Sequence, residues 1–341
     1  MKAALYSGPK DLKIVEIETP KPKIGEILIR VHACATCGTD AKIYNHGHPR
    51  LQPPQVIGHE IAGEIVEIGP EVTGHKIGDR VQVIAAIPCG DCWACKAGKM
   101  QICINQLSMG YQFAGGFAEY MIIPNEVVRV NGVNLIPDNL SYDEAAAAEP
   151  MACALNAQEL INVGPGDVVL VMGAGPIGCM HIRLARALGA VHVTLADINS
   201  NRLKLSADAV KPDAVIDMSK VDIEEAVKTS IPEPGPNVII TAAPAGVAQE
   251  QAVRMIRPGG RISFFGGLPK DKPMVSIDSN LVHYKELILA GANGSTPEHN
   301  RRALELMASG KVNVSDLLTH RVSLDEVEKA IDLVLGGDAI K

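Results

Sequence analysis

Four cysteines lie within fifteen residues of this chain, at Cys89, Cys92, Cys95 and Cys103. Thiolates at such short spacings suit a closed tetrahedral zinc site, in which no coordination position stays open for a substrate. Because we find no secretion signal, a disulfide framework is not expected, and clustered thiols then favour a metal. The spacing predicts a structural zinc site, with an iron–sulfur cluster or four free thiols as alternatives.

A second set of candidate ligands is dispersed along the chain. Cys37 begins the segment Cys-Gly-Thr-Asp, His59 and Glu60 are adjacent, and Glu149 lies in an alanine-rich stretch. Taken singly, each has an ordinary structural explanation, such as a buried thiol, a loop histidine or a surface acid. Together they form a Cys/His/carboxylate set of the kind that binds a catalytic zinc with one position open.

The segment 173–178 matches the pattern G-x-G-x-x-G, between a strand-like run and a helix-like run. Glycines at these places permit a tight turn and a close approach to a pyrophosphate, whose charge the helix N-terminus favours. Asp197 ends the next strand-like run, nineteen residues after Gly178. Its carboxylate would accept hydrogen bonds from both ribose hydroxyls and repel a 2′-phosphate. The pattern therefore favours NAD over NADP, a preference that nearby Arg202 weakens; a glycine turn without a ligand is the alternative.

Short β-branched runs punctuated by Pro and Gly occupy the first 150 residues and predict a compact β domain. A capping box at 141–144 precedes an alanine-rich helix over 145–160, which Pro150 should kink or divide. The predicted strands of this part are 14–17, 26–32, 61–68, 80–84 and 117–123.

Strand-like and helix-like runs alternate from about residue 167, as in a doubly wound parallel sheet. The predicted strands are 167–172, 191–196, 214–216, 238–241 and 261–265, with helices at 176–188, 200–207, 223–228 and 248–256. Two more helices are expected at 298–309 and 324–335. The fold class is therefore α/β, with a β-rich first domain and a parallel-sheet second domain.

The chain has 341 residues and a formal net charge of −7, with 47% apolar residues and only 3% aromatic ones. This length allows two domains, and Val, Ile, Leu and Ala must fill their cores. An acidic chain is a poor partner for nucleic acid or an anionic membrane, since both need basic surface. Because no apolar run reaches the roughly 18 residues of a membrane helix, we expect a soluble cytoplasmic protein with a small-molecule substrate.

Taken together, these motifs resemble the zinc-dependent medium-chain dehydrogenase/reductases of the alcohol dehydrogenase superfamily, over essentially the whole chain. The resemblance implies a GroES-like catalytic domain at 1–151, carrying the structural zinc lobe at about 88–104. It implies a Rossmann NAD-binding domain at 152–289 and a segment at 290–341 that returns to the first domain. It also implies a homotetramer, with a dimer as the other possibility.

The resemblance assigns roles residue by residue. Cys37 and His59 match the catalytic zinc ligands, Glu60 matches a carboxylate that ligates or nearly ligates zinc, and Thr39 matches the hydroxyl that relays the substrate proton. Glu149 matches a position that is glutamate in polyol dehydrogenases and cysteine in classical alcohol dehydrogenases. The cofactor-binding positions that it implies are Gly173, Gly175, Pro176, Ile177, Gly178, Asp197 and Arg202.

These matches imply a dehydrogenase that oxidises a secondary alcohol to a ketone and passes a hydride to NAD. One zinc ion would be catalytic and one structural. Because of Glu149, we expect a sugar alcohol as substrate, as in the sorbitol/L-iditol 2-dehydrogenase type. The alternatives are an L-threonine 3-dehydrogenase, a sugar-alcohol-phosphate dehydrogenase and, from another class, an inactive zinc-stabilised binding protein.

Three features bear on the substrate. Ala41-Lys42 replaces the Val-His common in sorbitol and threonine dehydrogenases, and 291–294 lacks a substrate-contacting arginine of sorbitol dehydrogenases. The basic loop that contains Lys42, His46, His48 and Arg50 could hold a phosphate, or could simply be a solvated surface.

Overall fold

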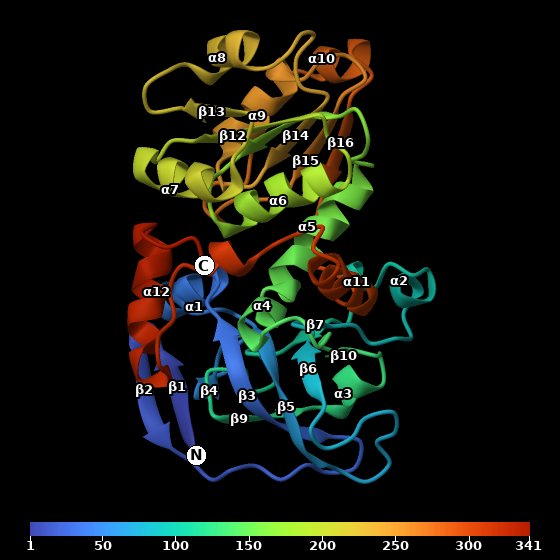
Figure 1. The fold of residues 1–341 in the computed structure, drawn as a ribbon, viewed down its shortest axis with the longest axis vertical. Coiled ribbons are helices and arrows are strands. Elements are labelled where there is room, and N and C mark those ends of the chain that lie inside the picture. The colour runs from blue at the N-terminus through green and yellow to red at the C-terminus, as the bar shows by residue number, and fades with distance from the viewer. The chain divides into compact units, whose positions relative to one another are not determined.

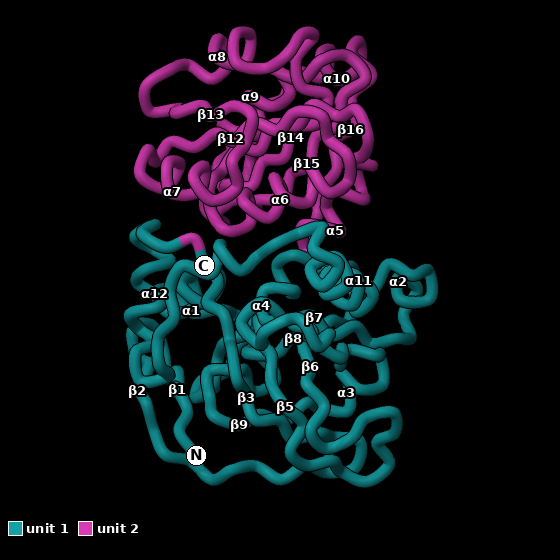
Figure 2. The backbone as a smooth tube through the Cα atoms, in the orientation of Figure 1, with its two compact units in different colours: residues 1–152, 294–339, 341 teal, residues 153–293, 340 magenta.

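The computed structural model describes all residues from 1 to 341, which divide into two compact units (Figure 2). Unit 1 contains residues 1–152, 294–339 and 341, and unit 2 contains residues 153–293 and 340. Both β-rich and α/β parts are present, so the predicted α/β fold class is confirmed (Figure 1). No helix combines the length and the apolar composition needed to cross a membrane.

Unit 1 is built on a five-stranded antiparallel sheet in the order β10-β6-β5-β3-β9. A three-stranded sheet, β2-β1-β4, and a small pair, β7-β8, complete its strands. The strands of the unit are β1 (Lys2–Gly8), β2 (Asp11–Glu16), β3 (Ile27–Ala35), β4 (Gln55–Val56), β5 (Glu60–Ile68), β6 (Arg80–Val83), β7 (Ala86–Ile87), β8 (Leu107–Ser108), β9 (Tyr120–Ile123) and β10 (Val133–Leu135).

Short helices surround these sheets. In chain order they are α1 (Gly38–His46), α2 (Trp93–Lys96), the 3-10 turn η1 (Met100–Ile102), α3 (Asn125–Val128), α4 (Tyr142–Ala146), α11 (Pro297–Ala308), the 3-10 turns η2 (Ser315–Leu317) and η3 (Leu324–Glu326), and α12 (Val327–Gly336).

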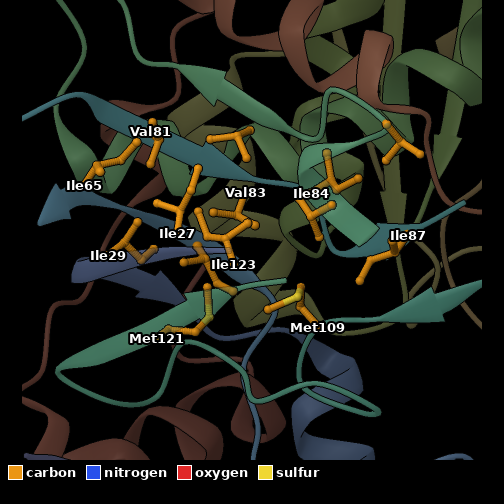
Figure 3. Close-up of a cluster of buried hydrophobic side chains, with 14 residues drawn as sticks. Ile27, Ile29, Ile65, Val81, Val83, Ile84, Ile87, Met109, Met121 and Ile123 are labelled. Carbon is orange, nitrogen blue, oxygen red and sulfur yellow. The ribbon is translucent and has the colours of Figure 1, made fainter. Parts of the chain in front are cut away.

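Aliphatic side chains from the five-stranded sheet fill the core of unit 1, as the low aromatic content requires (Figure 3). Ile27 and Ile29 of β3 meet Ile61 and Ile65 of β5 in this core, and all four side chains are fully buried. The alternation that turns these positions inward leaves Arg30 of β3 exposed, as the twofold period of a strand requires. This packing fixes the register of β3 against β5.

Unit 2 is a six-stranded parallel sheet in the order β13-β12-β11-β14-β15-β16, as expected of a doubly wound fold. Figure 1 shows α6 and α7 on one side of this sheet and α8 and α9 on the other. The strands are β11 (Val168–Met172), β12 (His192–Asp197), β13 (Ala214–Asp217), β14 (Val238–Thr241), β15 (Arg261–Phe264) and β16 (Ile288–Gly291). The helices are α6 (Pro176–Ala187), α7 (Ser200–Val210), α8 (Ile223–Ser230), α9 (Gly246–Met255) and α10 (Ser279–Tyr284).

The alanine-rich helix breaks at a different place from the one predicted. Ser141 caps α4 by accepting a hydrogen bond from the Glu144 N–H, as the capping box predicts. The interruption then falls at Ala147, and α5 (Ala148–Leu160) runs on through Pro150. Pro150 is the third residue of α5, where an amide N–H has no acceptor within the helix, so proline costs nothing there.

Candidate functional site

The pairing of β3 with β5 brings the dispersed candidate ligands together. Ala35, the last residue of β3, lies opposite Glu60, the first residue of β5. Cys37 follows β3 after one intervening residue, and His59 precedes β5 directly. A one-residue slip would send Glu60 to the other face of the sheet, so the packed register decides whether the site exists.

Cys37, His59 and Glu60 each place one ligand atom within 4.8 Å of the others. Their chemistry, a thiol, an imidazole and a carboxylate, fits the donor preferences of zinc. His59 and Glu60 are buried, and Cys37 is half-buried. Glu149, the second residue of α5, is also buried but lies outside this tight set. Thr39, also outside it, is the second residue of α1 and half-buried.

Gly58 allows the main chain to turn into His59 at this site. Gly58 has a φ of +93°, and a Cβ there would lie 2.9 Å from Cys34 Sγ and 2.8 Å from a ring carbon of Phe117. Any other residue would therefore be strained in its backbone and crowded in its side chain. Gly58 lets the chain turn into His59 without displacing either neighbour.

Asp40 is the functional residue that the sequence interpretation did not single out. Its carboxylate is fully buried, with Oδ2 accepting a hydrogen bond from the Cys37 N–H at 2.8 Å and Oδ1 lying 3.2 Å from His59 Nδ1. Burial lowers the pKa of His59, but the charge of Asp40 and contacts with Asp40 and Cys37 outweigh it and raise that pKa well above its usual value. A carboxylate behind one imidazole nitrogen fixes the ring and leaves the other nitrogen for a metal.

Lys341, which contacts Glu60, is the second residue of the site that the sequence interpretation did not identify. Its ammonium is buried, donates to Glu60 Oε1 at 2.6 Å and to the Thr36 main-chain oxygen at 3.0 Å, and also contacts Glu60 Oε2. Burial raises the pKa of Glu60 to about 7, against the opposing charges of Lys341 and His59. Nearby Glu149 raises it further. The contact neutralises a buried carboxylate that would otherwise be costly.

A cavity of about 380 Å³ lies beside this region of unit 1. Its walls include residues 31–36 of the β3 segment, residues 320–324 and Lys341, but not Cys37, His59 or Glu60. The cavity therefore does not coincide with the candidate catalytic zinc site.

The four clustered cysteines form the second candidate metal site. The sulfur atoms of Cys89, Cys92, Cys95 and Cys103 all lie within 4.8 Å of one another. Main-chain N–H groups point at them, and the hydrogen bonds from Cys95 and Ile104 lower the pKa of Cys92 to about 6. Four thiols gathered this closely fit the closed tetrahedral site that the spacing predicts.

The glycine turn in unit 2 has the geometry of a dinucleotide site. Gly173 follows β11 with a φ of +122°, and α6 begins at Pro176 after the N-cap Gly175. A Cβ on Gly178 would lie 1.8 Å from the Gly173 oxygen, so only glycine allows this packing. Asp197 ends β12 and accepts hydrogen bonds from the Ala174 N–H at 2.6 Å and the Asn199 N–H at 2.7 Å. These bonds hold the carboxylate next to the turn, where a ribose would bind.

The other two predicted cofactor residues are Ile177, which lies within this turn, and Arg202, which lies on α7. Ile177 is the second residue of α6, and Arg202 lies in the first turn of α7 with its N–H bonded to Asn199 Oδ1 at 3.0 Å. Both side chains are half-buried.

The chain is similar in sequence to known proteins. Residues 23–132 match the alcohol dehydrogenase GroES-like domain, and residues 176–309 match the zinc-binding dehydrogenase domain. The chain is 37% identical to an L-threonine 3-dehydrogenase of Pyrococcus furiosus, over 99% of this chain and 96% of that protein. It is 33% identical to an L-threonine 3-dehydrogenase of Alteromonas mediterranea, over 95% of this chain and 94% of that protein.

Solved structures agree with the fold. A zinc-binding dehydrogenase of Sinorhizobium meliloti 1021, bound to NADP, superposes with a TM-score of 0.88 at 31% identity, covering 97% of this chain and 94% of that one. A protein of Escherichia coli CFT073, described as a short chain alcohol dehydrogenase and complexed with NADH, superposes with a TM-score of 0.89 at 29% identity, covering 98% and 95%. The chain therefore belongs to the zinc-binding alcohol dehydrogenase family of oxidoreductases.

Proposed function

We propose that this protein is an NAD-dependent dehydrogenase that oxidises the 3-hydroxyl of L-threonine or a closely related 2-amino-3-hydroxy acid. The observation that carries the proposal is near full-length identity of 37% and 33% to L-threonine 3-dehydrogenases, in a chain that assembles Cys37, His59 and Glu60. The sequence interpretation ranked a sugar alcohol first and threonine as an alternative. The relatives favour the threonine alternative.

Cys37 and His59 would hold the catalytic zinc, with Glu60 or Glu149 as the carboxylate that completes the set. When bound, zinc supplies a Lewis acid that lowers the pKa of a substrate hydroxyl. Asp40 keeps the His59 ring oriented by its contact with Nδ1. Thr39 would carry away the proton of the substrate hydroxyl, because it lies on α1 only two residues after Cys37.

The cofactor would bind across the turn at 173–178. Main-chain N–H groups at the start of α6 would hold the pyrophosphate. The Asp197 carboxylate would accept the ribose hydroxyls and repel a 2′-phosphate. This supports NAD over NADP, although one of the two structural relatives is bound to NADP.

We also propose that the enzyme is a cytoplasmic homotetramer. Strand β16 is an edge of the parallel sheet, and Ile288 on it is 52% exposed, as suits a strand that pairs with a second copy. Light scattering on the purified protein would give the mass directly, and a monomer would contradict the assembly.

The substrate is tested by a kinetic panel at 340 nm with L-threonine, sorbitol, L-iditol, 2,3-butanediol and a hexitol phosphate, each with NAD⁺ and NADP⁺. We expect kcat/KM to be highest for L-threonine with NAD⁺, by roughly tenfold or more over each sugar alcohol, because a charged group on a substrate gives a strong binding contact. Preferential turnover of sorbitol or L-iditol would restore the sugar-alcohol interpretation and overturn this one.

A further inference from the structure

Arg50, Tyr111 and His48 form a cluster that the proposed mechanism does not use. His48 and Arg50 lie in the loop after α1, and Tyr111 lies in the loop after β8. The rings of His48 and Tyr111 form a T-shaped pair, with a centroid distance of 4.9 Å and an interplanar angle of 84°. The Arg50 guanidinium carbon lies 5.7 Å from the centre of the same ring.

One edge of the Arg50 guanidinium is fixed by the protein. Nη2 donates to Ser108 Oγ at 2.8 Å and to the Gln106 main-chain oxygen at 3.4 Å. The backbone is held too, since the Arg50 N–H donates to His48 Nδ1 at 3.2 Å and the Arg50 oxygen accepts from Gln112 Nε2 at 3.3 Å. The remaining donors, Nε and Nη1, make no hydrogen bond. The group is therefore pre-oriented, with donors left for a ligand.

Tyr111 offers a further donor. Its ring is half-buried, and its main-chain oxygen is held by Gln55 Nε2 at 3.1 Å. Burial raises the pKa of Tyr111, which favours the protonated phenol at neutral pH. An O–H group in such a position is free to donate to an incoming oxygen.

The chain next to Tyr111 packs against the segment that carries His59. A Cβ on Gly110, which directly precedes Tyr111, would lie 3.0 Å from the Gly58 oxygen, and Gly58 directly precedes His59. The charges of His59, Asp40 and Cys37 also influence the pKa of the Tyr111 phenol. A substrate whose hydroxyl sits at the Cys37/His59 set would therefore have the Tyr111 and Arg50 donors as neighbours.

We propose that Arg50, assisted by the Tyr111 hydroxyl, binds the carboxylate of the 2-amino-3-hydroxy acid substrate. This inference rests on the proposed function and names the group that selects its substrate. A guanidinium fork matches a planar carboxylate by paired charge-assisted hydrogen bonds, whereas a sugar alcohol presents no charge to it. A phosphate shares the chemistry of a carboxylate here, so the test has to separate the two.

The test compares zinc-loaded wild type with Arg50→Gln. We expect Arg50→Gln to raise KM for L-threonine roughly 10- to 100-fold, as befits the loss of hydrogen bonds to a charged group. L-threoninamide has no carboxylate, so the preference of the enzyme for L-threonine over L-threoninamide should shrink by the same factor. Titration calorimetry with L-threonine on the NADH complex should show the same loss of affinity, independent of turnover.

Matched variants sharpen the comparison. Arg301→Gln removes an exposed arginine that Glu298 and Glu305 already hold on α11, and it should leave every constant within about twofold of wild type, as exposed ion pairs contribute little. Tyr111→Phe removes only the hydroxyl and should raise KM for L-threonine about 3- to 10-fold. Arg50→Lys keeps the charge but not the fork and should recover part of the loss.

The outcomes distinguish two failures. If wild type oxidises L-threonine and Arg50→Gln does so with an unchanged KM, the carboxylate site is wrong and the proposed function stands. If wild type does not oxidise L-threonine at all, the proposed function fails and this inference fails with it. Oxidation of a hexitol phosphate that depends on Arg50, without oxidation of threonine, would assign the cluster to a phosphate and overturn the carboxylate assignment.

Discussion

Asp40 holds two of the candidate zinc ligands in place. One oxygen accepts the Cys37 N–H at the start of α1, and the other lies against His59 Nδ1. The Asp40 side chain is fully buried, where an ionised carboxylate is costly unless charged or polar groups lie close to it. Twenty-one residues lie between Cys37 and His59 in the chain. The Asp40 side chain therefore links two segments that are distant in sequence.

Asp40→Asn separates these two contacts. The amide oxygen of asparagine can still accept the Cys37 N–H, but the negative charge facing His59 is lost. We expect the affinity of the catalytic site for zinc to fall about 10- to 100-fold, the usual cost of removing an outer partner of a histidine ligand. Competition with a chromophoric chelator measures it, with the exposed carboxylate variant Asp325→Asn as the control. Unchanged zinc affinity in Asp40→Asn would show that the contact only caps α1.

The segment between Cys89 and Cys103 has little regular structure that could stabilise it without a metal. Between Cys89 and Cys103 it has only the one-turn helix α2 and the turn η1. Its large apolar residues Trp93 and Ile104 are 62% and 65% exposed, so the lobe has almost no core of its own. A bound metal is the remaining source of stability for a segment of this kind.

Cys103→Ser should therefore release the lobe zinc and destabilise the fold. We expect the zinc content to fall by about one ion per chain and Tm to fall by roughly 5–15 °C, because structural zinc contributes several kcal/mol to folding. Elemental analysis and calorimetry measure both quantities. Cys153→Ser makes the same change of sulfur to oxygen outside the lobe and should keep its full zinc content. A Cys103→Ser protein that also kept its zinc would refute a metal-held lobe.

Elements with a strong local signal were predictable from the sequence. The turn at 173–178 and the capping box at Ser141 are set by nearby residues, and both are present as expected. Helix α1 was missed because its start depends on Asp40, a residue with no apolar period around it. The break of the alanine-rich helix was placed at Pro150 instead of Ala147, because a proline near a helix start looks the same in sequence as one inside it.

The candidate zinc ligands could be predicted from the sequence, but the residues that contact and orient them could not. Cys37, His59 and Glu60 stand in short motifs that carry a chemical meaning by themselves. Lys341 reaches Glu60 across 281 positions of the chain, and nothing near residue 341 marks that contact. Contacts of this kind depend on the register of β3 on β5 and on the inclusion of residues 294–339 in unit 1. Both are set by tertiary packing and not by the local sequence.

The whole chain joins three kinds of chemistry that a dehydrogenase needs. Unit 1 gathers a Cys/His/carboxylate set and a separate four-thiol set, and unit 2 carries the glycine turn with its acidic strand end. The acidic balance of the whole molecule, −7, does not prevent a local anion site, because Arg50 lies beside Tyr111 in a loop of its own. Overall charge therefore says little about which substrate binds.

The most direct measurement compares zinc content and L-threonine oxidation in wild type and His59→Ala. We predict about two zinc ions per chain and NADH formation from L-threonine in wild type. His59→Ala should keep about one ion, in the cysteine lobe, and lose at least roughly 100-fold in kcat/KM, because the metal that activates the hydroxyl is gone. Full activity in His59→Ala, or oxidation of L-threonine by a wild-type protein with only the lobe zinc, would contradict the account.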